Sequence, residues 1–186
     1  MGEASPREPL ERELKFAGVE LAALRARLLE LEAERLAPSS LEDSWIFDRQ
    51  GELQAADCML RLREDGRGAQ VTFKGPARVE GAVKVRREHV MRVDSGEQAR
   101  ALFESLGYRV VRRYQKYREE WRLGGEMIAL DHTPIGDLVE FEGANAEVIA
   151  RRCGFDPAKA DLRSYQRLYE EHLERHPEAP RDMLFP

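Results

Sequence analysis

Cysteine is scarce in this chain of 186 residues, which carries only Cys58 and Cys153. No further cysteine or histidine lies near either of them at the spacing of zinc ligands, so the sequence predicts neither a disulfide framework nor a zinc centre. Positive charge is not in excess either, because 30 lysines and arginines stand against 35 acidic residues, for a net charge of −5. We therefore expect no nucleic-acid partner bound by bulk attraction to phosphate.

Long hydrophobic runs are also missing. No apolar stretch approaches the roughly 20 residues that span a bilayer, and the opening stretch 1–9 is polar and charged. The chain shows no repeat, no low-complexity tract and no linker, and its length suits one well-packed domain. These absences predict a cytoplasmic protein without a membrane partner, folded as a single domain over residues 1–186.

Helical periodicity and capping residues mark four segments of the chain. Ser95 as an N-cap and Gly107 as a stop frame one of them, and an amphipathic pattern marks another near the N-terminus. The tail after Pro177 is expected to be loosely held. The predicted helices cover residues 19–31, 95–107, 145–153 and 164–175.

Between the helices, short segments alternate charged and apolar residues. Residues i and i+2 of a strand point to the same face, so Arg61 and Arg63 share one face while Leu60 and Leu62 share the other. Six segments repeat this arrangement, and long ionic side chains fill their polar faces almost exclusively. The polar faces carry Glu11, Glu13 and Lys15; Arg61 and Arg63; Thr72 and Lys74; Lys84, Arg86 and Glu88; Lys116, Arg118, Glu120 and Arg122; and Glu140 and Glu142.

A solvated outer face of an antiparallel sheet would explain each of these segments by itself. The complete set favours another arrangement, because carboxylates occupy the first and last strands and cations occupy the strands between them. If the strands close into a barrel with the charged faces inward, the apolar faces point outward and the amphipathic helices cover them. The charged lumen must then hold water, counter-charges or a ligand, since burying an unpaired charge costs several kcal/mol.

The charges on this inner face indicate what the lumen would bind. Eight cations and six carboxylates, Asp131 among them, leave a formal charge of +2. A triphosphate carries roughly −4 to −5 near neutral pH. Hard cations such as Mg²⁺ or Mn²⁺ bind between carboxylate and phosphate oxygens, and one or two of them would bring the lumen close to neutrality. The pattern predicts a site for a small-molecule triphosphate together with Mg²⁺ or Mn²⁺.

The segment Glu11-Arg12-Glu13-Leu14-Lys15 resembles the ExExK signature of the CYTH superfamily. These triphosphate tunnel enzymes include class IV adenylate cyclases, thiamine triphosphatases and inorganic triphosphatases. Further matches follow in the order of the family and extend the resemblance, and with it the expected domain core, over about residues 8–175. They are Trp45-Ile46-Phe47-Asp48, Leu60-Arg61-Leu62-Arg63, Thr72-Phe73-Lys74-Gly75-Pro76, Arg86-Arg87-Glu88, Lys116-Tyr117-Arg118, Asp131, Gly136, Glu140-Phe141-Glu142 and Ser164-Tyr165.

The resemblance implies an α+β fold, with a closed antiparallel β-barrel of about eight strands around a polar tunnel and helices packed on the outside. It implies catalytic roles for Glu11, Glu13, Lys15 and Glu142. It implies triphosphate binding by Lys15, Arg61, Arg63, Lys74, Lys84, Arg86, Lys116 and Arg118. It implies metal binding by Glu11, Glu13, Glu140 and Glu142, while Glu88 and Asp131 either orient the cations or bind a second metal. Val90 departs from the pattern, because many members have another glutamate there.

Three functions remain open. The first is metal-dependent hydrolysis of inorganic triphosphate or a small organic triphosphate, in which water attacks the terminal phosphorus. The second is a class IV adenylate cyclase that converts ATP to cyclic AMP and pyrophosphate, in which the ribose 3′ hydroxyl attacks the α phosphorus. The third is a polyphosphate- or nucleotide-binding module without catalysis. The sequence also leaves open whether the chain forms a homodimer.

Overall fold

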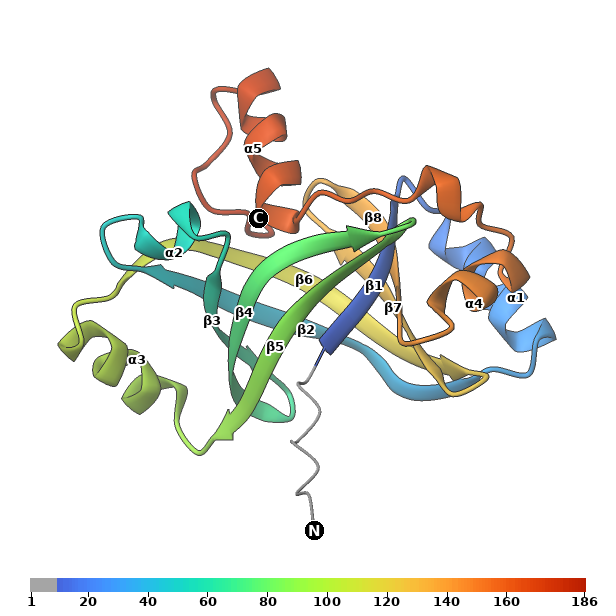
Figure 1. The fold of residues 1–186 in the computed structure, drawn as a ribbon, viewed down its shortest axis with the longest axis horizontal. Coiled ribbons are helices and arrows are strands. Elements are labelled where there is room, and N and C mark those ends of the chain that lie inside the picture. The colour runs from blue at the N-terminus through green and yellow to red at the C-terminus, as the bar shows by residue number, and fades with distance from the viewer. Residues whose placement is uncertain (1–9) are drawn as a thin grey trace, which may run out of the picture.

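The computed structural model describes residues 10–186 and shows eight antiparallel strands closed into a barrel (Figure 1). Around the barrel the order is β1, β5, β4, β3, β2, β6, β7, β8, and β1 completes the ring by pairing with both β5 and β8. The predicted barrel is confirmed. Residues 1–9, the polar start of the expected domain, lie outside the described residues. The strands are β1 Leu10–Ala17, β2 Glu34–Asp48, β3 Met59–Asp65, β4 Gly68–Glu80, β5 Val83–Val93, β6 Arg109–Leu123, β7 Glu126–Thr133 and β8 Gly136–Glu142.

Five helices and one 3₁₀ turn accompany the strands within residues 10–186. All four predicted helices are present, and their ends lie within two residues of those expected. The sequence pattern did not predict α2 or the 3₁₀ turn. No helix in the described part of the chain is long and apolar enough to cross a membrane. The helices are α1 Leu21–Glu30, α2 Glu52–Ala55, α3 Gly96–Ser105, α4 Ala146–Arg152 and α5 Tyr165–Arg175, and the 3₁₀ turn is Pro157–Lys159.

Serine caps begin two of the helices. The side chain of Ser95 accepts a hydrogen bond of 3.2 Å from the backbone N–H of Gln98 at the start of α3, and Ser164 accepts an equivalent bond of 3.2 Å from Arg167 at the start of α5. Each cap satisfies an N–H group that has no partner within its own helix. The second cap matters for function, because it sets where α5 begins above the barrel.

The apolar faces of the strands point outward, and helices cover them. On one side α1 and α4 pack on β1, β7 and β8, where Phe16 and Phe141 form ring contacts with Phe155 at 4.8 and 5.4 Å. On another side α3 packs Phe103 against Phe47 at 5.1 Å (Figure 1). The hydrophobic core therefore lies between the barrel and its helices, and the interior of the barrel is left for polar side chains.

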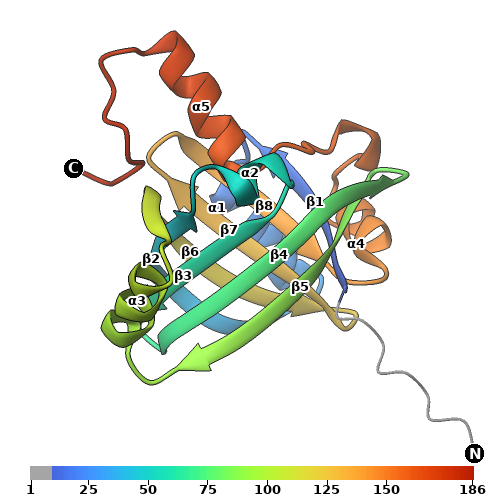
Figure 2. The same ribbon diagram turned by 60° about the vertical axis from the view of Figure 1, so that its left-hand side comes forward.

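The segment that contains α5 and the C-terminal tail covers one end of the barrel (Figure 2). The tail was expected to be loosely held, and the structure shows that this expectation is wrong. Met183 is 1% exposed, and its backbone exchanges hydrogen bonds with Arg113 at 3.1 Å and Gln115 at 2.8 Å. The side chain of Tyr169 in α5 donates to the carbonyl of Asp182 at 3.1 Å. These contacts depend on residues far apart in the sequence, so the local pattern could not predict them.

Candidate functional site

A cavity of about 210 Å³ occupies the interior of the barrel. This volume is far above the ~15 Å³ that a single water molecule needs, so the cavity can hold a polyatomic ligand. The inward side chains predicted by period-two alternation meet here from six different strands. All eight predicted phosphate-binding residues line the cavity, namely Lys15, Arg61, Arg63, Lys74, Lys84, Arg86, Lys116 and Arg118.

Carboxylates line the same cavity. Five of the predicted six are among the lining residues, and Glu120, which the charge count omitted, joins them. Asp131 does not line the cavity but lies directly behind two of its cations. The lining carboxylates are Glu11, Glu13, Glu88, Glu120, Glu140 and Glu142.

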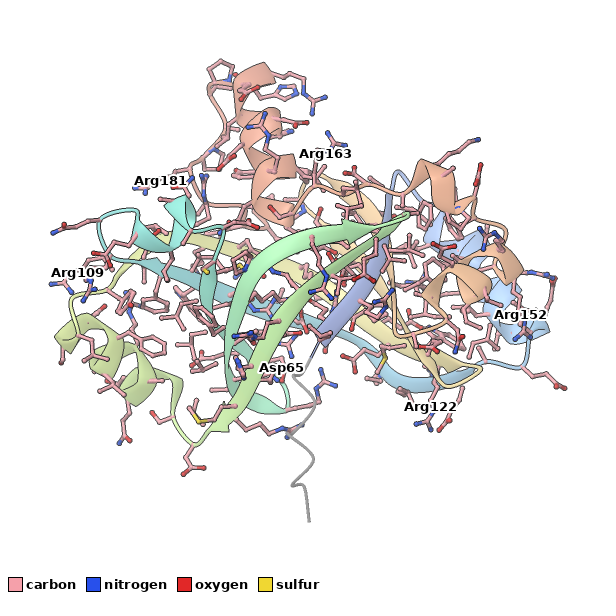
Figure 3. All side chains as sticks on the ribbon, viewed as in Figure 1. Asp65, Arg109, Arg122, Arg152, Arg163 and Arg181 are labelled. Atoms are coloured by element: carbon pink, nitrogen blue, oxygen red, sulfur yellow. The ribbon has the colours of Figure 1, made fainter. Side chains whose placement is uncertain are left out.

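The two ends of the tunnel differ in charge. At the end covered by α5, the ammonium groups of Lys15 and Lys116 lie 4.8 and 4.6 Å from the centre of the Tyr165 ring. At the other end, the cavity shares Glu11 and Glu142 with an open surface groove. Figure 3 shows side chains crowding the barrel between its two ends. The tunnel thus has a covered cationic end and an open mouth rich in carboxylates.

Lys15 is held deep in the tunnel, where its side chain is 3% exposed. Its ammonium group lies 3.1 Å from Glu140 and 3.4 Å from Glu13, and it donates to the carbonyl of Arg163 at 3.2 Å. Burial by itself would lower the pKa of Lys15, but the two carboxylates outweigh burial and raise that pKa. Lys15 therefore stays charged and ties β1 to the segment that leads into α5.

Asp131 is fully buried behind the cavity wall, where it binds two of the cations that line the cavity. Lys116 donates to it at 3.0 Å, Arg118 donates through two nitrogens at 2.6 and 2.7 Å, and the hydroxyl of Tyr165 also donates to it. Burial would raise the pKa of Asp131, but the neighbouring cations reverse this effect and lower it. All of its acceptor capacity is directed at tunnel side chains, so the geometry matches the first of its two expected roles, which is to orient cations.

The carboxylates near the open mouth are less fully neutralised. Burial, together with neighbouring carboxylates, raises the pKa of Glu142 to about 7, although Arg118 acts in the opposite direction. Burial also raises the pKa of Glu11, whose Oε1 is paired with Lys74 and whose Oε2 is buried without a hydrogen-bond partner among the described residues. Carboxylate oxygens that lack sufficient positive charge are suitable donors for a hard divalent cation.

A preformed metal centre is nevertheless not present in the described residues, since no three acidic, histidine or cysteine side chains cluster closely enough to hold an ion. The tunnel carboxylates bind lysine and arginine instead. Glu140, for example, pairs with both Lys15 and Arg118. The chemistry of the donors at the mouth therefore fits a divalent cation, but metal binding would require these carboxylates to exchange some of their present partners.

Sequence reasoning assigned no site role to one buried acidic residue and two tyrosines, although Tyr165 stood among the residues of the family resemblance. Glu42 in β2 is 1% exposed and lies beside Arg63 and Lys116. The hydroxyl of Tyr114 accepts a hydrogen bond from Arg61 at 3.1 Å, and Tyr165 contributes its ring at the covered end. Tyr114 shares parity with Lys116 and Arg118 along β6, a signal that could have identified it.

Counting the missed carboxylates changes the charge of the tunnel. With Glu42 and Glu120 included beside Asp131, eight carboxylates match the eight cations, and the formal charge is zero where the sequence count left +2. A triphosphate of roughly −4 to −5 would then need compensation from about two divalent cations. A polyanionic ligand would therefore have to bring counter-charge of its own into the tunnel.

Two arginines near the site form hydrogen bonds that connect elements of the fold. Arg113 binds Asp43 through two hydrogen bonds of 2.5 and 2.9 Å, and Arg112 donates to the carbonyl of Arg181 at 2.7 Å. These bonds connect β6 with β2 and with the tail. Both side chains thus have partners within the chain.

Solved structures of other proteins share this fold. One is a protein from Vibrio parahaemolyticus provisionally assigned as an adenylate cyclase, with 22% identity, 88% of this chain and 99% of that chain covered, and a TM-score of 0.78. Another is from Pyrococcus horikoshii, with 23% identity, 87% and 99% coverage, and a TM-score of 0.73. A third, a provisionally assigned adenylyl cyclase from Hippeastrum with a dominant triphosphatase activity, has 16% identity, 87% and 96% coverage, and a TM-score of 0.67. No curated protein sequence matches the chain.

The model of the CYTH domain matches residues 9–165, which include every strand of the barrel and the first residue of α5. Proteins of this family are generally metal-dependent enzymes with triphosphatase or cyclase activity. The match spans most of the chain and contains the complete set of tunnel cations. The chain therefore belongs to the CYTH domain family.

Proposed function

We propose that this protein is a divalent-metal-dependent phosphohydrolase that cleaves inorganic triphosphate or a small organic triphosphate inside the barrel. The observation that supports this proposal best is the convergence of eight lysine and arginine side chains on one enclosed cavity of about 210 Å³. Such a set of cations neutralises the charge that develops on phosphoryl oxygens in the transition state, and enclosure strengthens each interaction.

The side chains of this chain bind and orient the substrate. Lys15 and Lys116, at the covered end, are placed to hold one end of the polyphosphate, while Arg63 and Arg118 reach it along the tunnel wall. The attacking water forms a new bond to the terminal phosphorus and gives up a proton to solvent, while the bridging P–O bond breaks. Pyrophosphate, or the organic diphosphate where the substrate carries an organic group, leaves with the electron pair of that bond. Fixed positioning of these groups supplies most of the catalysis, because phosphoryl transfer needs little covalent chemistry from the protein.

We infer that Glu11 and Glu142 at the open mouth, together with Glu13 and Glu140 deeper in the tunnel, would hold Mg²⁺ or Mn²⁺. The unpartnered Oε2 of Glu11 and the raised pKa of Glu142 support this assignment. When bound, a divalent ion orients the polyphosphate and lowers the pKa of water. Entry of a triphosphate draws lysines and arginines towards the phosphates, which frees these carboxylates for the metal.

Release of phosphate from tripolyphosphate with Mg²⁺ or Mn²⁺ tests the proposal. We expect multiple turnovers, loss of activity with chelator, and a fall of at least about a hundredfold in Glu13→Ala and in Lys116→Met. Arg122→Met is a matched control, because Arg122 lies on the same strand as Lys116 but outside the cavity, paired with Glu34 at 2.6 Å. Unchanged release in Glu13→Ala, or release that is insensitive to chelator, would refute the proposal.

An adenylate cyclase is the second candidate, because the similar protein from Vibrio parahaemolyticus is provisionally assigned as one, whereas the Hippeastrum protein of that provisional name has a dominant triphosphatase activity. The lining of the cavity instead favours inorganic triphosphate, which is smaller than ATP. Its two lining tyrosines, the buried Tyr114 and the half-buried Tyr165, stack on each other with ring centres 6.3 Å apart and contact tunnel cations, so neither ring offers two free faces to a base. Incubation with ATP and Mn²⁺, followed by mass detection of cyclic AMP, distinguishes the two activities, and tight binding of tripolyphosphate without turnover would instead indicate a binding module.

A further inference from the structure

Glu42 lies behind the tunnel cations and has no role among the residues discussed so far. It does not line the cavity, and only 1% of it is exposed. Its Oε1 lies 2.7 Å from Nη1 of Arg63, and its Oε2 lies 3.7 Å from Nζ of Lys116 and 4.0 Å from Nε of Arg118. Its strand, β2, runs between the strands that carry these three cations, β3 and β6. One carboxylate thus contacts three cavity-lining side chains from both neighbouring strands.

This placement is unfavourable for a residue with a purely structural role. Neither oxygen of Glu42 accepts a hydrogen bond within the described part of the chain, so its lost hydration is compensated by ion pairing alone. Buried ionic groups can often be replaced by apolar groups of similar volume without loss of stability. A buried carboxylate without hydrogen bonds calls for another explanation, and its neighbours provide one.

Glu42 completes a clamp whose other half is Asp131. Asp131 in β7 bonds Lys116 and Arg118 from one side, and Glu42 in β2 contacts the same two side chains from the other. Arg63 is not bonded to Asp131; besides Glu42 it bonds Gln70 at 2.5 Å, and its Nε lies 3.9 Å from Asp65. Side chains held from two sides have little rotational freedom, so their charged ends point to fixed places in the cavity.

We propose that Glu42 is a positioning residue that holds Arg63, Lys116 and Arg118 in the arrangement required by the phosphoryl group in transfer. The inference rests on the proposed triphosphatase function. Two opposite effects of removing Glu42 make it testable. As a negative charge, Glu42 repels a polyanion, so its neutralisation alone tightens substrate binding. As an orienting group, it keeps the cations preorganised, so its loss slows the chemical step.

The experiment compares Glu42→Gln with Glu119→Gln in steady-state hydrolysis of tripolyphosphate with Mg²⁺, with thermal melting measured in parallel. Glu119 is the control, because it is also a buried carboxylate, 4% exposed, but lies on the outer face of the barrel. There it bonds Arg25 and Trp121. We expect kcat to fall at least tenfold in Glu42→Gln while KM stays unchanged or decreases. Glu119→Gln should keep kcat within about twofold of the wild type even where its melting temperature falls.

Two further variants test whether Glu42 acts through the cations. Glu42→Asp keeps the charge on a shorter side chain and should recover part of the lost kcat. In an Arg63→Lys background, Glu42→Gln should lower kcat by a much smaller factor than it does in the wild-type protein, because the effects of residues that act as a unit are not additive. A full effect of Glu42→Gln in that background would contradict action through Arg63.

A kcat for Glu42→Gln within twofold of the wild type would overturn the inference, as would an equal fall in Glu119→Gln. Absence of phosphate release from the wild-type protein would refute the triphosphatase function instead. In that case the positioning role of Glu42 is tested by NMR, through the guanidinium ¹⁵N signals of Arg63 and Arg118. Broadening of these signals in Glu42→Gln supports a positioning role, and unchanged signals overturn it.

Discussion

Replacing Asp131 by asparagine keeps the shape of a fully enclosed side chain and removes its charge. In the native structure this carboxylate accepts hydrogen bonds from Lys116 at 3.0 Å, from Arg118 at 2.6 and 2.7 Å, and from the hydroxyl of Tyr165. The amide would accept with one oxygen only and would present an N–H₂ group to two cations. The variant therefore leaves two buried positive charges with less compensation.

The size of the effect follows from the distances. At an effective dielectric constant of about 20, two opposite charges 3 Å apart attract each other by about 5 kcal/mol. Measured losses on breaking a buried ion pair are about 3–5 kcal/mol, because the remaining charge stays buried. For a chain of this size each kcal/mol shifts the melting temperature by about 2–4 °C. We expect Asp131→Asn to melt about 10–15 °C below the wild type.

Thermal melting followed by circular dichroism measures this difference at neutral pH. Asp137→Asn is the matched control, since Asp137 pairs with His132 at 2.6 Å in a largely solvent-accessible position, where such pairs contribute about 0–1 kcal/mol. The control should melt within about 3 °C of the wild type. If Asp131→Asn behaves like the control, the cations do not depend on Asp131 and the electrostatic account of the tunnel is wrong.

Three other perturbations test features outside the cavity. Burial raises the pKa of Cys153 to about 11, so at pH 8 a thiol reagent should modify the half-buried Cys58 and leave Cys153 unmodified until the pH approaches 11; equal rates at pH 8 would contradict this. Met183→Ala should lower the free energy of unfolding in urea by about 2–5 kcal/mol, because Met183 is 1% exposed, and a loss below 1 kcal/mol would show that the tail is not anchored. Gly143→Ala places a Cβ 1.4 Å from Glu126 Oε2 at a φ of +134°, so a loss of about 1–3 kcal/mol is expected, and an unchanged urea midpoint would refute the strain.

The barrel and most of its lumen could be predicted from the sequence, because a period of two assigns each charged residue to a face. Lys116 and Arg118, or Glu140 and Glu142, lie on the inner face as that parity requires. The same reasoning places Trp121 outside, where it is buried against the helices. Alternation was informative because β1, β3, β7 and β8 pair with both of their neighbours without a shift of register.

Glu42 escaped prediction for a physical reason. The pairing of β2 with β6 shifts register at three places, on both sides of Glu42, so no continuous alternation marks its face. Its own neighbours, Leu41 and Asp43, do not form an apolar outer face. The short helix α2 and the anchored tail are likewise held by contacts between distant parts of the chain, such as the isolated bridge between Tyr114 and Met183. Local periodicity carries no information about such contacts.

The position of β1 in the ring has a consequence for synthesis on the ribosome. β1 leaves the ribosome first, yet its two partners are β5 and β8, and the latter ends only at Glu142. The first strand therefore cannot pair with β5 until that strand has been translated, and the ring cannot close until β8 has followed. Its glutamates and lysine stay hydrated by bulk water and mobile ions during that interval. The helix that covers the tunnel, α5, follows β8 in the chain, so the compartment is enclosed only after the last strand of the barrel has been made.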